Sequence, residues 1–156
     1  MDARPENPVP VESPLATTRI LVVDNNKTVR NGVADALEFI GDSPTPEKAD
    51  SGSEALELLE KAKETKAFDI VITDLNMPGM SGVELAQAIQ EGNLVKMGTL
   101  IMTMNPDQIS PEQTQQLIDQ GIVAAILPKS GNFTGLLLKQ TTELAKSANK
   151  PPTANP

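Results

Sequence analysis

Polar side chains that could hold a ligand stand at the ends of four short apolar runs in this 156-residue chain. Asp24 and Asn25 follow the first run, Asp74 follows a later one, and Thr103 and Lys129 end two more. A single residue of this kind is commonly a helix cap, a turn residue or a solvated surface charge. Four such positions in order are harder to explain by capping. They indicate that the carboxyl ends of parallel strands meet at one ligand site.

The stretch from Phe68 to Gly82 is the most informative part of the chain. Its apolar run Ile70-Val71-Ile72 is rich in β-branched residues and predicts a strand that is buried on both faces. The run leads to Asp74, and a loop with proline and glycine follows. Ser81 and Glu84 then have the spacing of a capping box, which predicts that a helix begins there. Asp74 is therefore expected at the carboxyl end of an inner strand.

The whole chain repeats this alternation of strand and helix. The strands are expected at 19–23, 44–49, 68–73, 100–103 and 122–127, and the helices at 28–40, 51–64, 81–90, 110–120 and 134–146. Five such units predict an α/β fold, (βα)5, in which helices cover both faces of a doubly wound five-stranded parallel sheet. Pro44 and Pro46 place the second strand at an edge of that sheet, because proline cannot donate a ladder hydrogen bond.

Proline-rich composition marks both ends of the chain as tails or linkers. Residues 1–17 and 148–156 contain few large apolar side chains and show no periodicity, so we expect them to be disordered. The folded domain is expected at 18–147, which is close to the usual size of a single domain.

Composition excludes several classes of function. The chain has no cysteine and no histidine, so it can have no disulfide, no thiolate metal site and no imidazole base. With a net charge of −8 and no Trp or Tyr, it is not expected to bind nucleic acid directly. It contains no apolar run of membrane-spanning length and no signal-peptide pattern, so we expect no membrane insertion and a cytoplasmic location.

Several motifs together resemble the receiver domain of two-component response regulators and hybrid sensor kinases. They are Ile20-Leu-Val-Val-Asp24, Asp74-Leu-Asn-Met-Pro-Gly-Met-Ser-Gly82, Thr103 at a strand end, and Leu127-Pro-Lys129. The run from Asp74 to Gly82 is the most specific of these, and the match spans about residues 19–146. The resemblance implies a flavodoxin-like fold with strand order 2-1-3-4-5.

This resemblance implies a phosphorelay function rather than an enzyme. Asp74 would accept a phosphoryl group from a phosphohistidine on a sensor histidine kinase or a histidine phosphotransfer protein. The residues implied to bind Mg²⁺ are Asp24, Asn25, Asp74 and the backbone carbonyl of Asn76, all of them hard oxygen donors. Lys129 would pair with the carboxylate or the phosphoryl oxygens, and Thr103 would bind a phosphoryl oxygen and report the phosphorylated state by a conformational change.

Three positions depart from the pattern of the family. Asn25 replaces an acidic residue, and the missing charge predicts Mg²⁺ binding that is weaker by about 1–3 kcal/mol after desolvation. Ile126 replaces an aromatic residue that moves on activation. In another register of the fourth strand, Met104 would take the switch position of Thr103.

Alternative functions stay open at this stage. The chain could be a pseudo-receiver, a protein-interaction module that works without phosphorylation, which Asn25 and Ile126 favour. A phosphatase with an aspartyl nucleophile is disfavoured, because Asn76 stands where such enzymes need a second Asp. Both a single-domain regulator and the receiver of a hybrid kinase fit the sequence. A homodimer through the face made by residues 110–120, 122–127 and 134–146 is a further expectation.

Overall fold

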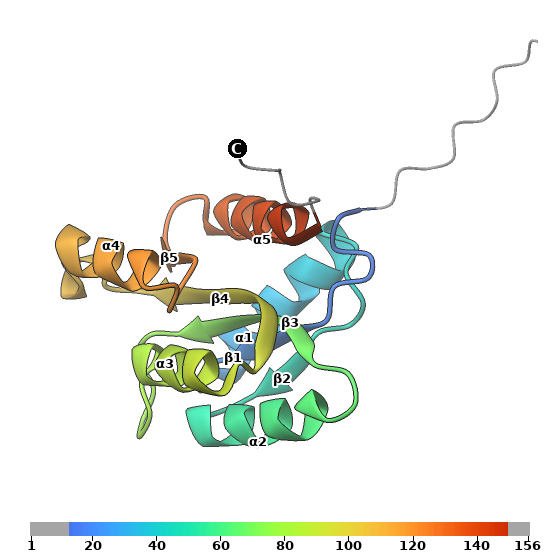
Figure 1. The fold of residues 1–156 in the computed structure, drawn as a ribbon. Helices are drawn as coiled ribbons and strands as arrows, with labels where there is room; N and C mark the ends of the chain where they lie inside the picture. Colours follow the sequence, from blue (N-terminus) through green and yellow to red (C-terminus); the bar gives the residue numbers. More distant parts are fainter. Residues whose placement is uncertain (1–12, 150–156) are drawn as a thin grey trace, which may run out of the picture.

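Five parallel strands form one sheet in the order β2-β1-β3-β4-β5. In the computed structural model the described part of the chain is residues 13–149 (Figure 1). The strands are β1 (Ile20–Val23), β2 (Glu47–Ala49), β3 (Phe68–Asp74), β4 (Val95–Thr103) and β5 (Ala125–Pro128). The predicted α/β fold and strand order are confirmed, and β2 lies at the edge of the sheet as predicted. It begins at Glu47 rather than at residue 44, so Pro44 and Pro46 precede the strand instead of lying in it.

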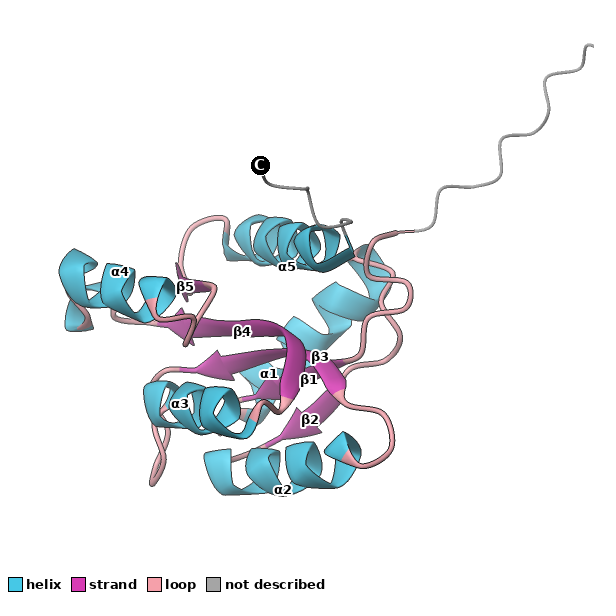
Figure 2. Cartoon of the chain, in the orientation of Figure 1, coloured by secondary structure: helices cyan, strands magenta, loops and turns pink. Residues whose placement is uncertain are grey.

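Helices cover both faces of this sheet, and α1 and α5 lie on the side opposite α2 and α3 (Figure 2). Their bounds are α1 (Lys27–Asp35), α2 (Gly52–Lys63), α3 (Gly82–Gly92), α4 (Pro111–Asp119) and α5 (Phe133–Asn149). None of the helices within residues 13–149 combines the length and the apolar content needed to cross a membrane.

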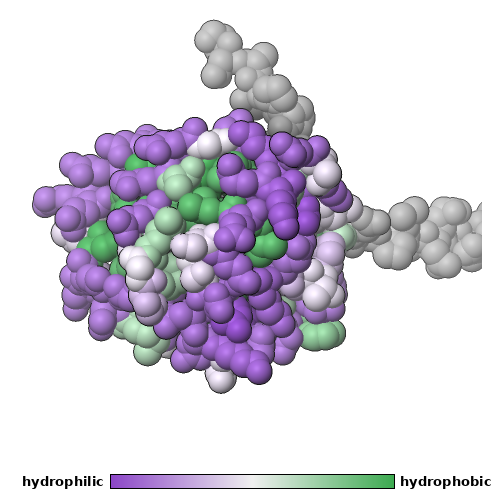
Figure 3. All heavy atoms as spheres, turned by 90° about the horizontal axis from the view of Figure 1, so that it is seen from below, coloured by the Kyte–Doolittle hydropathy of each residue, from purple (hydrophilic) through white to green (hydrophobic). Residues whose placement is uncertain are grey.

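Alternate residues of the inner strands face the two helical layers. In β1, Ile20 and Val22 pack with α1 and α5, whereas Leu21 and Val23 pack with α2 and α3. The two-residue period of a strand sends neighbouring side chains to opposite faces, so a strand between two layers must be apolar throughout. The outer surface is polar by contrast. The face shown in Figure 3 is mostly hydrophilic, with apolar atoms in small areas between the polar ones.

Some element boundaries differ from the sequence-based prediction. β4 begins at Val95 rather than at residue 100. The strand continues through an irregularity of its pairing with β3 near Gly98, where φ is +155°. β5 begins at Ala125 rather than at 122, although Ile122 and Val123 are buried beside the sheet. The first helix follows α-helical geometry only to Asp35 and continues as a π-helix to residue 40. The first half of β4 was not predicted because Lys96, Gly98 and Thr99 interrupt its apolar residues.

The folded domain also begins earlier than residue 18. Residues 13–17 form a turn, and the side chain of Leu15 is 0% exposed within the core formed by α1, α5 and the sheet. The Ser13 hydroxyl donates to the carbonyl of Gly41 at 2.7 Å, which ties this turn to the end of the first helix. Residues 13–17 therefore do not belong to a disordered tail. At the other end, residues 148 and 149 of the predicted tail 148–156 belong to α5. The remaining parts of the two predicted tails, residues 1–12 and 150–156, lie outside the described residues.

We predict that Leu15→Ala lowers the free energy of unfolding by about 2–4 kcal/mol, because a fully buried leucine leaves a cavity in a packed core. Urea unfolding monitored by far-UV circular dichroism measures this change. Ile40→Ala is the matched control, since Ile40 is 63% exposed and its truncation should cost under about 0.5 kcal/mol. Equal losses in the two variants would show that residues 13–17 do not contribute to the core.

Candidate functional site

One lysine bridges two buried carboxylates at the carboxyl edge of the sheet. The Lys129 Nζ lies 3.0 Å from Asp24 Oδ2 and 2.9 Å from Asp74 Oδ1. Asp24 is 1% exposed and Asp74 is 7% exposed, so both pairs are largely removed from water. Residues from β1, from β3 and from the loop after β5 therefore meet at one point. The convergence predicted from the strand ends is present for these three side chains.

Asp24 is held rigidly by the residues around it. Its Oδ1 accepts the backbone N–H of Asn26 at 2.8 Å, and its own N–H donates to the carbonyl of Ala49. The Asp24 carbonyl accepts from Arg30 Nη1 at 2.7 Å. Asn26 also caps α1 by accepting the N–H of Val29. The helix cap and the site are thus built from the same turn, and Asn26 and Arg30 are supporting residues that we did not predict.

A cavity of about 400 Å³ opens beside the lysine and the two carboxylates. Its lining residues are Asp24, Asn25, Asn26, Val29, Asp74, Asn76, Met104 and Lys129. Four predicted site residues thus line it together with the lysine, and Asn25 is exposed at its mouth. The donors available here are carboxylate, amide and carbonyl oxygens, the hard ligands that suit Mg²⁺. Among residues 13–149, no group of three or more His, Cys, Asp or Glu side chains has the arrangement of a metal site.

The environment of Asp74 favours its protonated form. Burial raises the pKa of its carboxyl above the usual value, and the nearby Asp24 charge raises it further. The hydrogen bond and charge of Lys129 and the backbone N–H of Leu75 oppose the shift without cancelling it. One cation shared by two buried anions leaves the site with an excess of one negative charge. Such a site attracts a further cation.

Thr103 ends β4, but it does not line the cavity. It is buried, and its hydroxyl accepts the backbone N–H of Asn105 at 3.0 Å, which fixes the start of the loop after β4. Met104 is 66% exposed and lies at the cavity instead. The register pairs Thr103 with Pro128, so Thr103 occupies the last strand position and Met104 belongs to the loop. The switch role of Thr103 stays a prediction.

The loop after Asp74 is held by a close approach of two backbones. A Cβ atom at Gly82 would lie 2.3 Å from the Asp74 carbonyl oxygen, and the Gly82 N–H donates to the carbonyl of Leu75 at 2.8 Å. The predicted capping box is present: Ser81 and Glu84 exchange hydrogen bonds of 2.9 and 3.1 Å. Glycine is required at residue 82 because α3 begins directly against the strand end that carries Asp74.

A five-stranded parallel sheet in this order, with paired carboxylates and a lysine at its carboxyl edge, defines a class of signalling domains, and the comparisons identify the family. The response regulator receiver domain profile matches residues 20–138. The chemotaxis protein CheY of Pseudomonas aeruginosa is 30% identical over 80% of this chain and 93% of its own length. The structure of CheY4 from Vibrio cholerae superimposes with a TM-score of 0.66 at 31% identity, covering 82% of this chain and 98% of the other.

A sensor protein matches a shorter stretch of the chain. The virulence sensor protein BvgS of Bordetella pertussis is 43% identical over 49% of this chain, which corresponds to 6% of BvgS. The chain belongs to the response regulator receiver domain family of two-component signalling.

We predict that Gly82→Ala lowers the free energy of unfolding by about 1–3 kcal/mol, because the new methyl group overlaps backbone atoms that cannot move aside. Gly32→Ala is the control, since a Cβ there meets nothing within 4 Å and the residue lies inside α1. That control should gain up to about 1 kcal/mol from higher helix propensity. Chemical denaturation of both variants checks the prediction, and a Gly82→Ala protein as stable as wild type would contradict it.

We predict that Asp74→Asn stabilises the protein at neutral pH when EDTA is present. Because the native pKa of Asp74 is raised, the native state keeps a proton that the unfolded state has released in the window above the usual value of 3.8. The free energy of unfolding therefore falls as pH rises through that window, and the full cost is present above the native pKa. The neutral amide avoids this cost and leaves Lys129 paired with Asp24.

The measurement is urea unfolding from pH 4 to pH 8. The difference in free energy of unfolding between Asp74→Asn and wild type should become smaller as pH falls from above the native pKa of Asp74 toward its usual value. Asp35→Asn, at an exposed carboxylate of α1, is the control and should show no such trend. If Asp74→Asn were less stable than wild type at pH 7.5, the conclusion that the native pKa of Asp74 is raised would be wrong.

Proposed function

We propose that Asp74 is the phosphoacceptor of this receiver domain. The observation that carries the proposal is the bridge from Lys129 to both carboxylates, at 3.0 and 2.9 Å, beside an open cavity. A carboxylate oxygen of Asp74 attacks the phosphorus atom, the P–N bond of a phosphohistidine breaks, and the imidazole leaves with the bonding electron pair. The Lys129 ammonium offsets negative charge on the phosphoryl oxygens as the transfer proceeds.

Mg²⁺ is the cofactor that this donor set fits. Asp24, Asp74, Asn25 and the backbone carbonyl of Asn76 would hold it, and it would neutralise charge on the phosphoryl group when bound. Only two of these donors are carboxylates, because residue 25 is an asparagine. We therefore expect weak binding, with much of the coordination shell left to water.

The phosphodonor is expected to be a histidine kinase or a histidine phosphotransfer protein, the partners with which receiver domains interact. We place this encounter in the cytoplasm, where ATP is available to form the phosphohistidine. The likeness to both a chemotaxis protein CheY and a virulence sensor protein is consistent with a stand-alone regulator and with a kinase-linked receiver. A homodimer through α4, β5 and α5 and the absence of direct nucleic-acid binding stay predictions.

A second candidate function is a pseudo-receiver that binds partners without being phosphorylated. The observation that favours it is the small number of acidic groups at the site, where the described residues supply two carboxylates in place of three. Ile126 supports it as well, since this residue packs beside Ile101 and Val123 and offers no aromatic ring that could move. The intact Asp74 and Lys129 pair opposes it.

Intact-protein mass spectrometry after incubation with acetyl phosphate or phosphoramidate and Mg²⁺ separates the two functions. We expect a gain of one phosphoryl group in wild type, no gain in Asp74→Ala, and loss of the label when EDTA is added first. Asp35→Asn serves as the control and should be labelled like wild type. The absence of labelling, together with no binding of beryllofluoride at high Mg²⁺, would favour the pseudo-receiver.

The same assay tests the effect of Asn25. Asn25→Asp restores a charge next to Asp24, and we expect labelling to saturate at about 5- to 160-fold lower Mg²⁺, which corresponds to about 1–3 kcal/mol. The maximal labelling at saturating Mg²⁺ should stay within about threefold of wild type. An unchanged Mg²⁺ requirement would show that residue 25 does not contact the metal.

A further inference from the structure

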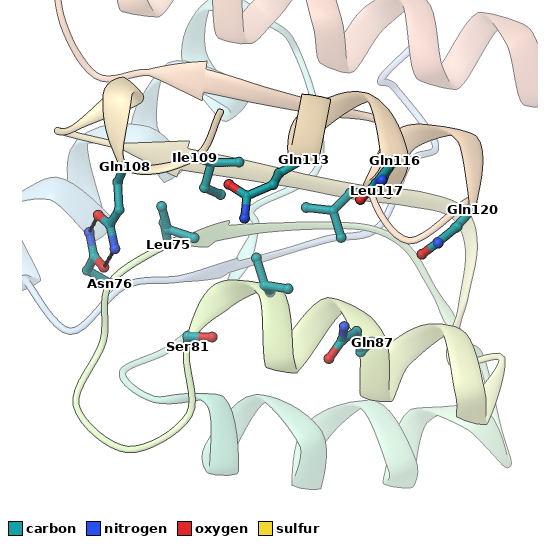
Figure 4. A pocket seen from close by; sticks show the side chains of 11 residues that line it. Leu75, Asn76, Ser81, Gln87, Gln108, Ile109, Gln113, Gln116, Leu117 and Gln120 are labelled. Carbon is teal, nitrogen blue, oxygen red and sulfur yellow. Dashed lines mark hydrogen bonds between the residues drawn. The ribbon is translucent and has the colours of Figure 1, made fainter. Parts of the chain in front are cut away.

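A second and larger cavity lies next to the acceptor site, between α3 and α4. Its volume is about 480 Å³, and its lining is rich in uncharged amides above an apolar floor (Figure 4). The amides include Gln87, Gln108 and Gln113, and Leu75 and Leu117 belong to the floor. Asn76 lines this groove as well as the cavity beside Asp74 and Lys129. It therefore stands in the wall between the two.

The side chain of Asn76 is clasped by Gln108 through two parallel hydrogen bonds. Asn76 Nδ2 donates to Gln108 Oε1 at 2.8 Å, and Gln108 Nε2 donates to Asn76 Oδ1 at 2.9 Å. Figure 4 shows the two carboxamides facing each other at one end of the groove. A bidentate pair of this kind fixes both the distance and the relative orientation of its partners, as a single hydrogen bond does not.

The two partners differ in how firmly their backbones are held. Gln108 ends a 3₁₀ turn that begins at Pro106, and its N–H donates to the Asn105 carbonyl at 3.0 Å. The N–H of Asn105 is in turn bound by the buried Thr103 hydroxyl, so this turn is anchored to the end of β4. Asn76 is the second residue of an irregular loop that follows β3 and regains regular structure only at α3. The two hydrogen bonds therefore tie Asn76, in the irregular loop, to Gln108, in the anchored turn.

We infer that Gln108 is a positioning residue for the acceptor site: its bidentate bond to Asn76 fixes the loop that follows Asp74. The Asn76 backbone carbonyl, the expected metal ligand, is one bond from the Cα atom that the clasped side chain restrains. The metal part of this inference rests on the function proposed above. The clasp also joins the loop after Asp74 to the segment that leads into α4, which gives this receiver a connection to its fourth helix that requires no aromatic ring at residue 126.

The test is the Mg²⁺ affinity of the Gln108→Ala protein, measured from amide chemical shifts in an NMR titration, since the chain has no Trp or Tyr to report by fluorescence. We expect the dissociation constant for Mg²⁺ to rise about three- to tenfold, the effect of losing a pair of exposed neutral hydrogen bonds. Asn76→Ala should show the same rise, and the double variant should show no additional one, because either change removes the whole clasp.

Gln116→Ala is the matched control. Gln116 lies on α4 and lines the same groove, and its side chain makes no hydrogen bond within residues 13–149. The Gln116→Ala protein should therefore bind Mg²⁺ with the same affinity as wild type. Labelling by acetyl phosphate at saturating Mg²⁺ should be similar in Gln108→Ala and wild type, because the clasp acts on the position of the ligand. Equal Mg²⁺ affinities for Gln108→Ala and Gln116→Ala would overturn the inference.

Failure of the proposed function is distinguishable from failure of this inference. If wild type neither binds Mg²⁺ nor accepts a phosphoryl group, the proposed function is wrong. Amide hydrogen exchange of Leu75 and Gly82 without metal then tests the clasp, since their N–H groups are hydrogen-bonded at the two ends of the loop. Faster exchange in Gln108→Ala than in Gln116→Ala supports the positioning of the loop, and equal exchange overturns it.

Discussion

The charge balance among Asp24, Asp74 and Lys129 is the constraint on which this structure depends. Two carboxylates are almost fully buried around one ammonium group, and residues 24 and 129 are separated by 105 positions in the chain. Burying ions is costly unless they are paired and hydrogen-bonded. Burial of the Asp74 carboxyl, and after it the charge of Asp24, raises the pKa of Asp74 despite the opposing effect of Lys129. Two buried carboxylates that share one ammonium group favour the approach of a further cation.

The surrounding backbone maintains this arrangement with few side chains. The β1 end is tied by Asn26 and Arg30, and the β3 end is closed by the approach of Gly82 to the Asp74 carbonyl. Both devices belong to the start of a helix, so the same residues that begin α1 and α3 also orient the carboxylates. Rigid elements that hold a reacting group in place lower the cost of reaching its productive geometry.

The substitutions that depart from the family pattern lie at the edge of this arrangement. Asn25 is exposed and lines the cavity, and it takes no part in the buried bridge from Lys129 to the two carboxylates. Ile126 packs into the cluster with Ile101 and Val123, so no aromatic ring is available to move. The contact between Asn76 and Gln108 offers a different link from the site to α4. This link consists of two neutral hydrogen bonds, and it involves neither residue 25 nor residue 126.

The sequence alone determined the α/β fold and the three charged groups at strand ends, because strand periodicity and polar strand ends are local patterns. The strand order followed from the resemblance to receiver domains. The sequence placed Asp74 and Lys129 at strand ends, and the parallel topology required those ends to meet. Only the tertiary structure revealed that Leu15 fills the core, that β4 continues through Gly98 and that Gln108 reaches Asn76. Leu15 lies in a proline-rich segment, and residues 95–99 contain no continuous apolar run. A contact between residues 76 and 108 depends on how two loops pack, and neither loop carries a periodic pattern that would predict it.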